Sequence, residues 1–205
     1  MISATVIITE LLAVLSISAA VGLRLALPLL LIGLLSGETL WNNVPLLSHI
    51  PPTIVVSVLV SWSLFELIIS KDRPTRPLLQ SFELFCSPFV GAIAGIAIAR
   101  SVSLEGWMMG LVGPLGGLLA FVIQLVQVGW LYRNRYPKLW VLFLQDFLCV
   151  CLVLFAFDAP RQGGLIALLL LWLAIRMSAA WRRWYVSQAA AQDRKRPRQY
   201  KQNPD

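Results

Sequence analysis

The amino-acid sequence predicts an all-α integral membrane protein with about six transmembrane helices. Of the 205 residues, 58% are hydrophobic and 13% are charged, whereas soluble domains carry about 25% charged residues. The mean hydropathy is +0.76. Apolar runs follow one another along the chain, and a helix needs about 20 such residues to cross a bilayer. We expect one transmembrane domain at residues 1–185 and a basic, disordered cytoplasmic tail at residues 186–205.

The first apolar run, residues 2–35, is too long for one regular span. Gly22 and Arg24 interrupt it, and Pro28 follows. Two interpretations are open: a long tilted helix that kinks at Pro28, or a full span that breaks near Gly22 and continues as a short half-helix. We favour a broken or kinked first element, with a loop from residue 36 to residue 51.

Five further runs predict helices at residues 52–69, 78–99, 106–132, 139–157 and 163–184. We expect Pro88 to break the third span and Pro114 to break the fourth, which should be broken or kinked like the first. Two similar interrupted elements suggest a 3+3 inverted repeat, an architecture found in many secondary transporters. A chance match between common membrane residues is the competing explanation.

The distribution of Lys and Arg predicts the orientation in the membrane. With six spans, 13 basic residues fall in the turns at 71–76 and 133–138 and in the C-terminal region, against two, Arg100 and Arg161, on the other side. The positive-inside rule then places both termini in the cytoplasm, in a bacterial inner membrane or a related internal membrane. The basic tail is also suited to bind anionic lipid.

Ionisable residues inside the apolar runs are the main indication of function, because each charge costs about 2.5–3.5 kcal/mol at the centre of a membrane helix. Glu66, Glu83 and Asp146 lie at similar depths from the basic turns, and Glu10 enters the same leaflet from the first run. Arg176 lies near the end of the last span, where its long side chain can extend the guanidinium group to the membrane interface. We therefore expect a polar centre, with Glu83 at its periphery, made of Glu66, Asp146, Arg24, Glu83, Gln124 and Gln127.

Two interpretations of this polar centre are open. It is either a cation or proton site that opens to the cytoplasm, or a set of ion pairs that holds helices together. Gln124 and Gln127 share one helix face and suit hydrogen bonds across helices. Small residues at intervals of four predict close helix packing at Gly91, Gly95, Gly113 and Gly117.

The sequence gives no support for an enzyme, a metal site or a cofactor. It has no phosphate-binding loop and no metalloprotease or serine-hydrolase motif, and its single histidine, His49, lies in a loop. The cysteines Cys86, Cys149 and Cys151 lie in apolar runs and form no metal-binding pattern. Because the basic residues lie at the ends of apolar runs, they do not indicate nucleic-acid binding.

Four short motifs occur in order along the chain: Gly22-Leu23-Arg24 with Pro28, Glu66 with Lys71-Asp72-x-Pro74, Pro88-x-x-Gly91, and Gln145-Asp146. Together, over roughly residues 10–180, they resemble an uncharacterised bacterial multi-pass membrane family, domain of unknown function 4126. That family tends to have His and Lys where this chain has Gln124 and Gln127, Glu-Asp where it has Gln145-Asp146, and Asp-Lys where it has Lys71-Asp72. The resemblance implies a multi-pass membrane protein and supplies no activity.

Two functions are consistent with these patterns. The first is a small transporter or permease-like protein whose polar centre meets solvent between the second and fifth spans. The second is a non-transporting scaffold or assembly factor that packs through its glycine faces, as a homo-oligomer or in a larger membrane complex. Both have the lipid bilayer as their surroundings.

Overall fold

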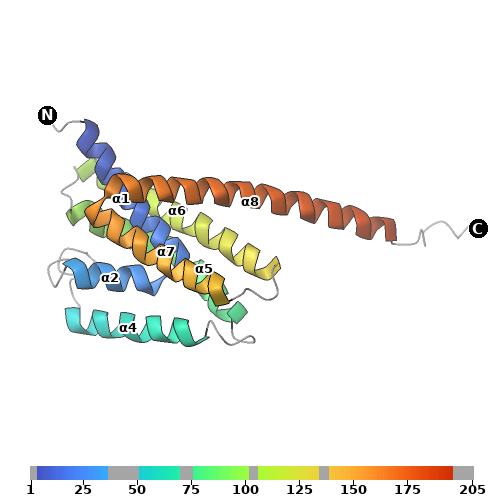
Figure 1. Ribbon diagram of the computed structural model, residues 1–205, viewed down its shortest axis with the longest axis horizontal. Coiled ribbons are helices and arrows are strands. Elements are labelled where there is room, and N and C mark those ends of the chain that lie inside the picture. Colours follow the sequence, from blue (N-terminus) through green and yellow to red (C-terminus); the bar gives the residue numbers. More distant parts are fainter. Residues whose placement is uncertain (1–3, 37–50, 70–75, 102–105, 134–138, 196–205) are drawn as a thin grey trace, which may run out of the picture.

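The computed structural model describes residues 4–36, 51–69, 76–101, 106–133 and 139–195, and the secondary structure in these ranges is helical. Figure 1 shows the arrangement of α1 (Ala4–Leu23), α2 (Ala26–Ser36), α4 (Pro52–Ile69), α5 (Arg76–Ser101), α6 (Gly106–Arg133), α7 (Leu139–Asp158) and α8 (Pro160–Lys195). The predicted loop with His49, both basic turns and the last ten residues of the tail fall largely outside the described residues.

The lengths of the helices indicate an integral membrane protein. Four are long and apolar enough to cross a membrane, over Leu79–Arg100, Gly110–Trp130, Trp140–Asp158 and Pro160–Ala179. Three described apolar segments are shorter, Ile7–Leu23, Ala26–Leu35 and Thr53–Glu66. The prediction of a multi-pass helical membrane protein is therefore confirmed, whereas the prediction of about six spans is confirmed only for four long ones.

The first element consists of two helices separated by Arg24 and Leu25. The chain breaks just after Gly22, as the second interpretation of this run proposed. Pro28 is the third residue of α2. Proline has no backbone N–H, but no helical hydrogen bond is lost at this position, because the first N–H groups of a helix have no partner within the helix. Of the two interpretations, the structure therefore agrees with the break near Gly22 and not with one continuous helix that kinks at Pro28.

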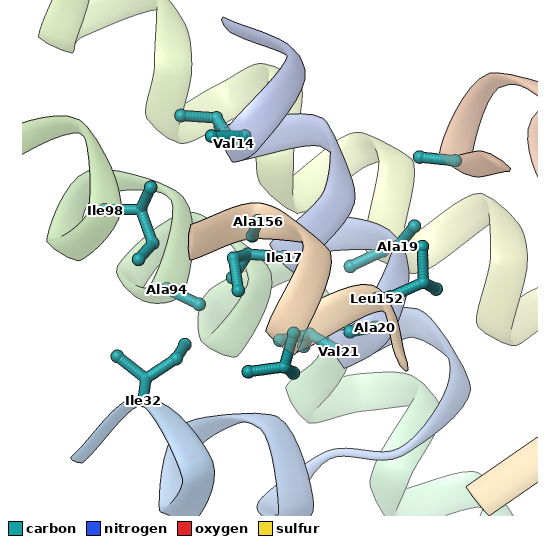
Figure 2. Close-up of a cluster of buried hydrophobic side chains, with 14 of the residues drawn as sticks. Val14, Ile17, Ala19, Ala20, Val21, Ile32, Ala94, Ile98, Leu152 and Ala156 are labelled. Carbon is teal, nitrogen blue, oxygen red and sulfur yellow. The ribbon is translucent and has the colours of Figure 1, made fainter. Parts of the chain in front are cut away.

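Helix α1 lies in the middle of the bundle and contacts α5, α6, α7 and α8. Its buried face combines small and branched side chains, including Ile17, Ala19, Ala20 and Val21, all without exposed surface. Figure 2 shows these residues packed with Ile32 and with side chains of α5 and α7. Small residues let the neighbouring helices approach α1 closely on every side.

Helix α2 turns back instead of continuing the direction of α1. In Figure 1, α1 runs inward from the N-terminal end of the bundle, and α2 returns toward the edge at which α4 begins. It packs against α4 and α7. The first element is thus a bent hairpin of two helices whose corner, at Arg24, lies inside the protein.

This hairpin changes the topology that the six-span prediction assumed. Thr9 of α1 contacts Arg161 at the start of α8, so α1 and α8 begin at the same end of the bundle. The C-terminal end of α8 lies at the opposite end and extends beyond the other helices (Figure 1). The sides of the membrane on which the two termini lie stay a prediction, and this arrangement of α1 and α8 favours opposite sides.

The predicted inverted repeat is wrong for the same reason. An inverted repeat requires the first and fourth elements to run in opposite directions. Here Ser18 lies against Gly116, and Gly22 lies against Ala120 and Ile123. The residue numbers of the contacting positions increase in the same direction along both helices, so α1 and α6 run parallel.

Helix α6 also differs from the predictions. Helix α6 continues through Pro114 without a break, because Pro is tolerated in membrane helices where neighbouring groups compensate for the lost hydrogen bond. Pro88 is likewise inside a continuous α5. Helix α8 continues to Lys195 and so includes the first ten residues of the predicted tail. Alanines 189–191 favour this extension.

Candidate functional site

Arg24 is the centre of the buried polar cluster. Its Nη1 lies 3.1 Å from Glu66 Oε1, and its Nε lies 2.6 Å from Asp146 Oδ1. Arg24 is 8% exposed and Glu66 is 3% exposed, whereas the Asp146 side chain is 22% exposed. One guanidinium therefore joins the break after α1 to α4 and to α7. The planar fork of Arg suits it to bind two carboxylates at once.

The break also leaves backbone carbonyls of α1 without helical partners, and side chains from other helices bind them. Leu23 O accepts hydrogen bonds from Gln145 Nε2 at 2.6 Å and from Gln127 Nε2 at 3.3 Å. The Cys149 thiol lies 3.5 Å from Ala20 O, a carbonyl that also accepts a hydrogen bond from Arg24 N at 3.0 Å. The sequence hypothesis included Gln127 but omitted Gln145, although the polar Gln145-Asp146 pair in an apolar run was a visible signal.

Glu83 belongs to the buried centre and does not lie at its periphery, as we had expected from the sequence. It is 7% exposed, and its Oε2 accepts a hydrogen bond from Gln124 Nε2 at 3.1 Å. It also interacts electrostatically with Glu66 and Arg24. Glu83, Gln124 and the Arg24 cluster thus form one continuous polar region between α1, α4, α5 and α6.

Several polar atoms in this region have no hydrogen-bond partner among the described residues. They include Glu83 Oε1, Gln124 Oε1, Gln127 Oε1 and the hydroxyl of Ser87. Gln124 is 2% exposed and Ser87 has no exposed surface. Buried polar atoms without a hydrogen bond are uncommon in protein interiors. More of the polar atoms around Glu83 lack a hydrogen-bond partner than of those around Arg24.

The glycines lie in the packing of α5 on α6 and α1. A Cβ on Gly117 would lie 2.5 Å from Pro88 O, and one on Gly91 would lie 2.5 Å from Ala120 Cβ. Gly113 faces Ile96, and Gly95 faces Val14 and Ser18. These faces hold the chain's own helices together, so they are not free surfaces for a partner.

Two other charges in the apolar runs lie apart from the centre. Glu10 follows Thr9 at the end of the bundle where α8 begins, about 21 Å along α1 from Arg24 at 1.5 Å per residue. Glu10 therefore lies apart from Glu66, Glu83 and Asp146, and the leaflet that it occupies stays a prediction. Arg176 is exposed, and its guanidinium lies 5.3 Å from the Trp172 ring.

An apolar groove of about 280 Å³ reaches the edge of the centre from between α6, α7 and α8. Gln127 and Gln145 contribute to its lining, next to Leu23. Glu66 and Glu83 do not line this groove. Among the described residues, no group of three His, Cys, Asp or Glu side chains is placed to hold a metal ion.

A family model described as domain of unknown function (DUF4126) matches residues 11–180. The match includes every residue of the polar centre and leaves out only the start of α1 and the end of α8 among the described helices. No curated protein matches the chain, and no solved structure matches it.

Proposed function

We propose that this chain, which belongs to the DUF4126 family, is a small permease-like membrane protein that moves a small cation past its polar centre. One observation carries the proposal. Three buried or partly buried acids, Glu66, Glu83 and Asp146, gather around a single arginine at a broken membrane helix. Acids inside membrane helices are costly and are characteristic of ion pathways and proton relays.

The broken helix supports the same function. Transporters often bind ions at the ends of discontinuous membrane helices, where helix termini meet inside the protein. In this chain α1 ends at Leu23 and α2 begins at Ala26, beside the three acids. A rigid continuous helix would offer no such point at which the chain can bend.

The polar centre divides into a satisfied part and an unsatisfied part. Arg24 is paired with Glu66 and Asp146, and Leu23 O is bound by two amides. This part is closed and suited to hold α1, α4 and α7 in place. Glu83 lacks a cation of its own, and one of its oxygens is unpartnered. The transported cation would therefore exchange at Glu83.

Flux measurements on the purified full-length chain test this function. In proteoliposomes with an imposed gradient of H⁺, Na⁺ or K⁺, we expect flux of at least one of them above that of empty liposomes. Glu66→Gln should reduce this flux, because it removes the charge that holds Arg24. Glu10→Gln, which lies away from the centre, should leave it unchanged. Absence of flux for all three cations in correctly folded protein would contradict the proposal.

A second candidate function, a scaffold in a membrane complex, is favoured by the outer face of α4. This face carries an apolar groove of about 520 Å³ with Ser57, Ser61 and Trp62 in its lining. The two serine hydroxyls bond backbone oxygens of their own helix at 2.8 Å, so a second membrane helix could pack on them without unpaired donors. Helix α4 packs mainly against α2, which leaves this face open.

Cross-linking separates the two functions. A cysteine at Ser57 should form a cross-link to a partner in native membranes if α4 is a docking face, whereas a cysteine at Ser178 on exposed α8 serves as a control. A protein that elutes from mild detergent only as a monomer, with no cross-link through position 57, would exclude the scaffold.

A further inference from the structure

We infer that Glu83 is the residue that takes up and releases a proton in the polar centre, with Glu66 as its exchange partner and Gln124 as its positioning residue. The inference rests on the proposed function and deepens it, since it identifies the cation as the proton. The observation behind it is a buried carboxyl group that has one amide donor, one unpartnered oxygen and no cation of its own.

The first step concerns charge. Arg24 supplies one positive charge, and its Nη1 and Nε already bind Glu66 and Asp146. Glu83 is attracted by Arg24 but also repelled by Glu66. An ionised carboxylate without its own partner is very costly in a buried site, and it normally becomes neutral by binding a proton.

The second step concerns the groups that face Glu83 from each helix packed against it. Helix α4 contributes the Glu66 carboxylate, the α1–α2 break contributes the Arg24 guanidinium, and α6 contributes the Gln124 amide. On α5 itself, Ser87 lies one turn further along and its hydroxyl has no partner. While both are ionised, Glu66 and Glu83 can only accept hydrogen bonds, and a proton on Glu83 Oε1 would supply a donor between the two carboxyl groups.

The third step distinguishes a proton from a metal ion. Gln124 directs an N–H donor at Glu83 Oε2, and a donor repels a metal cation at that oxygen. Within the described ranges, no three side chains of the His, Cys, Asp or Glu type form a metal-binding group. A proton needs only one oxygen and fits the single orphaned Oε1 atom.

The transfer itself balances simply. The O–H bond of neutral Glu83 breaks, its electron pair stays on the Glu83 carboxylate, and the proton bonds to an oxygen of the Glu66 carboxylate. Glu66 is then neutral and holds Arg24 less tightly, while Asp146 keeps its ion pair. Proton movement is thereby linked to the contact between α4 and the break, the contact that Arg24 and Glu66 make at 3.1 Å.

Dicyclohexylcarbodiimide labelling tests this assignment without any flux measurement. The reagent is apolar and reacts with the protonated carboxyl group: the acid proton moves to a carbodiimide nitrogen while the carboxyl oxygen bonds to the central carbon. In the full-length chain in lipid nanodiscs, mass spectrometry should locate the label on Glu83, and labelling should fall as the pH rises. Glu83→Gln should lose this label, and Glu10→Gln should retain it.

Infrared spectroscopy of the same samples provides a measurement that does not depend on access of the reagent. A carboxylic C=O band should be present in the wild type, shift in Gln124→Leu, and be absent in Glu83→Gln. If Glu83→Gln does not fold, the label site and the pH dependence in the wild type still decide the question. No label and no such band at any pH would overturn the inference, as would Na⁺ or K⁺ that blocks labelling at constant pH.

The outcomes separate this inference from the proposed function. A labelled Glu83 in a chain that shows no flux would support the proton site and contradict the permease. Cation flux in a chain whose Glu83 is neither labelled nor protonated would support the permease and overturn the proton site.

Discussion

Replacing Arg24 by Met tests whether one arginine holds the broken helix in place. Met has a similar length but no charge and no donor, so the substitution removes both ion pairs at once. Glu66, which is 3% exposed, would then be left buried without a cation. Asp146 is affected less, because part of its side chain is exposed.

The expected loss of stability follows from this burial. Removing one partner of a buried ion pair costs about 3–5 kcal/mol, because the remaining charge is uncompensated. We attribute this cost to Glu66 and little to Asp146, whose exposure allows solvent to screen it. In a chain of this size, about 1 kcal/mol corresponds to roughly 2–4 °C in melting temperature. Arg24→Met should therefore melt about 6–20 °C below the wild type.

Thermal unfolding in mild detergent, followed by the fraction that stays monodisperse, measures this change. Arg176→Met is the matched control, since this exposed arginine lies over Trp172 and contributes at most about 1 kcal/mol. Adding Glu66→Gln and Asp146→Asn to Arg24→Met should recover part of the loss, because it removes the unpaired charges. Equal melting temperatures for Arg24→Met and the control would refute this account of the polar centre.

Three further predictions concern packing, capping and topology. Gly117→Ala should destabilise the chain by about 1–3 kcal/mol, because its Cβ would meet a backbone oxygen at 2.5 Å; in the same melting assay Gly129→Ala, with nothing within 4 Å, should not. Gln145→Leu should cost about 0.5–1.5 kcal/mol, since it removes the 2.6 Å hydrogen bond to Leu23 O while the longer one from Gln127 remains; an unchanged melting temperature would contradict this role. Reporters placed before Ala4 and after the C-terminal end of α8 should lie on opposite sides of the membrane, and a reading on the same side would contradict the hairpin.

The limits of most helices could be predicted from the sequence because they depend on local signals. The expected spans at 52–69 and 139–157 agree with α4 and α7 within one residue. Prolines and charged turns end the apolar runs at these points, and such signals act on the nearest few residues. The break after Gly22 is of the same kind, since a glycine and an arginine interrupt the run there.

The membership of the polar centre was also largely predictable. The sequence groups Arg24, Glu66 and Asp146 because each charge must avoid lipid. In the structure, Arg24 Nη1 lies 3.1 Å from Glu66 Oε1 and Arg24 Nε lies 2.6 Å from Asp146 Oδ1. The burial of Glu83 could not be predicted in the same way. Its depth along α5 follows from its position in the sequence, but the side of the helix that faces α6 depends on how the glycines pack.

The direction of α2 is the feature that the sequence could not provide. Hydropathy shows which segments are apolar, but it is the same for a segment that crosses the bilayer and one that turns back. The sequence left two interpretations of the first run open, and neither of them gave the direction in which α2 runs. The contacts of Ser18 with Gly116 and of Thr9 with Arg161 show that α1 runs parallel to α6 and that it starts near the start of α8.

The hairpin and the polar centre are two consequences of the same break. A reversal inside an apolar bundle leaves carbonyl groups of α1 without helical partners, and these must be bound by donors from other helices. Gln127 and Gln145 supply those donors from α6 and α7, while Arg24, at the corner, draws Glu66 and Asp146 toward it. Glu83 is not required for these contacts at the break, because it binds neither a carbonyl of α1 nor the Arg24 guanidinium directly. A buried acid that the fold does not need is the one we expect to serve the function.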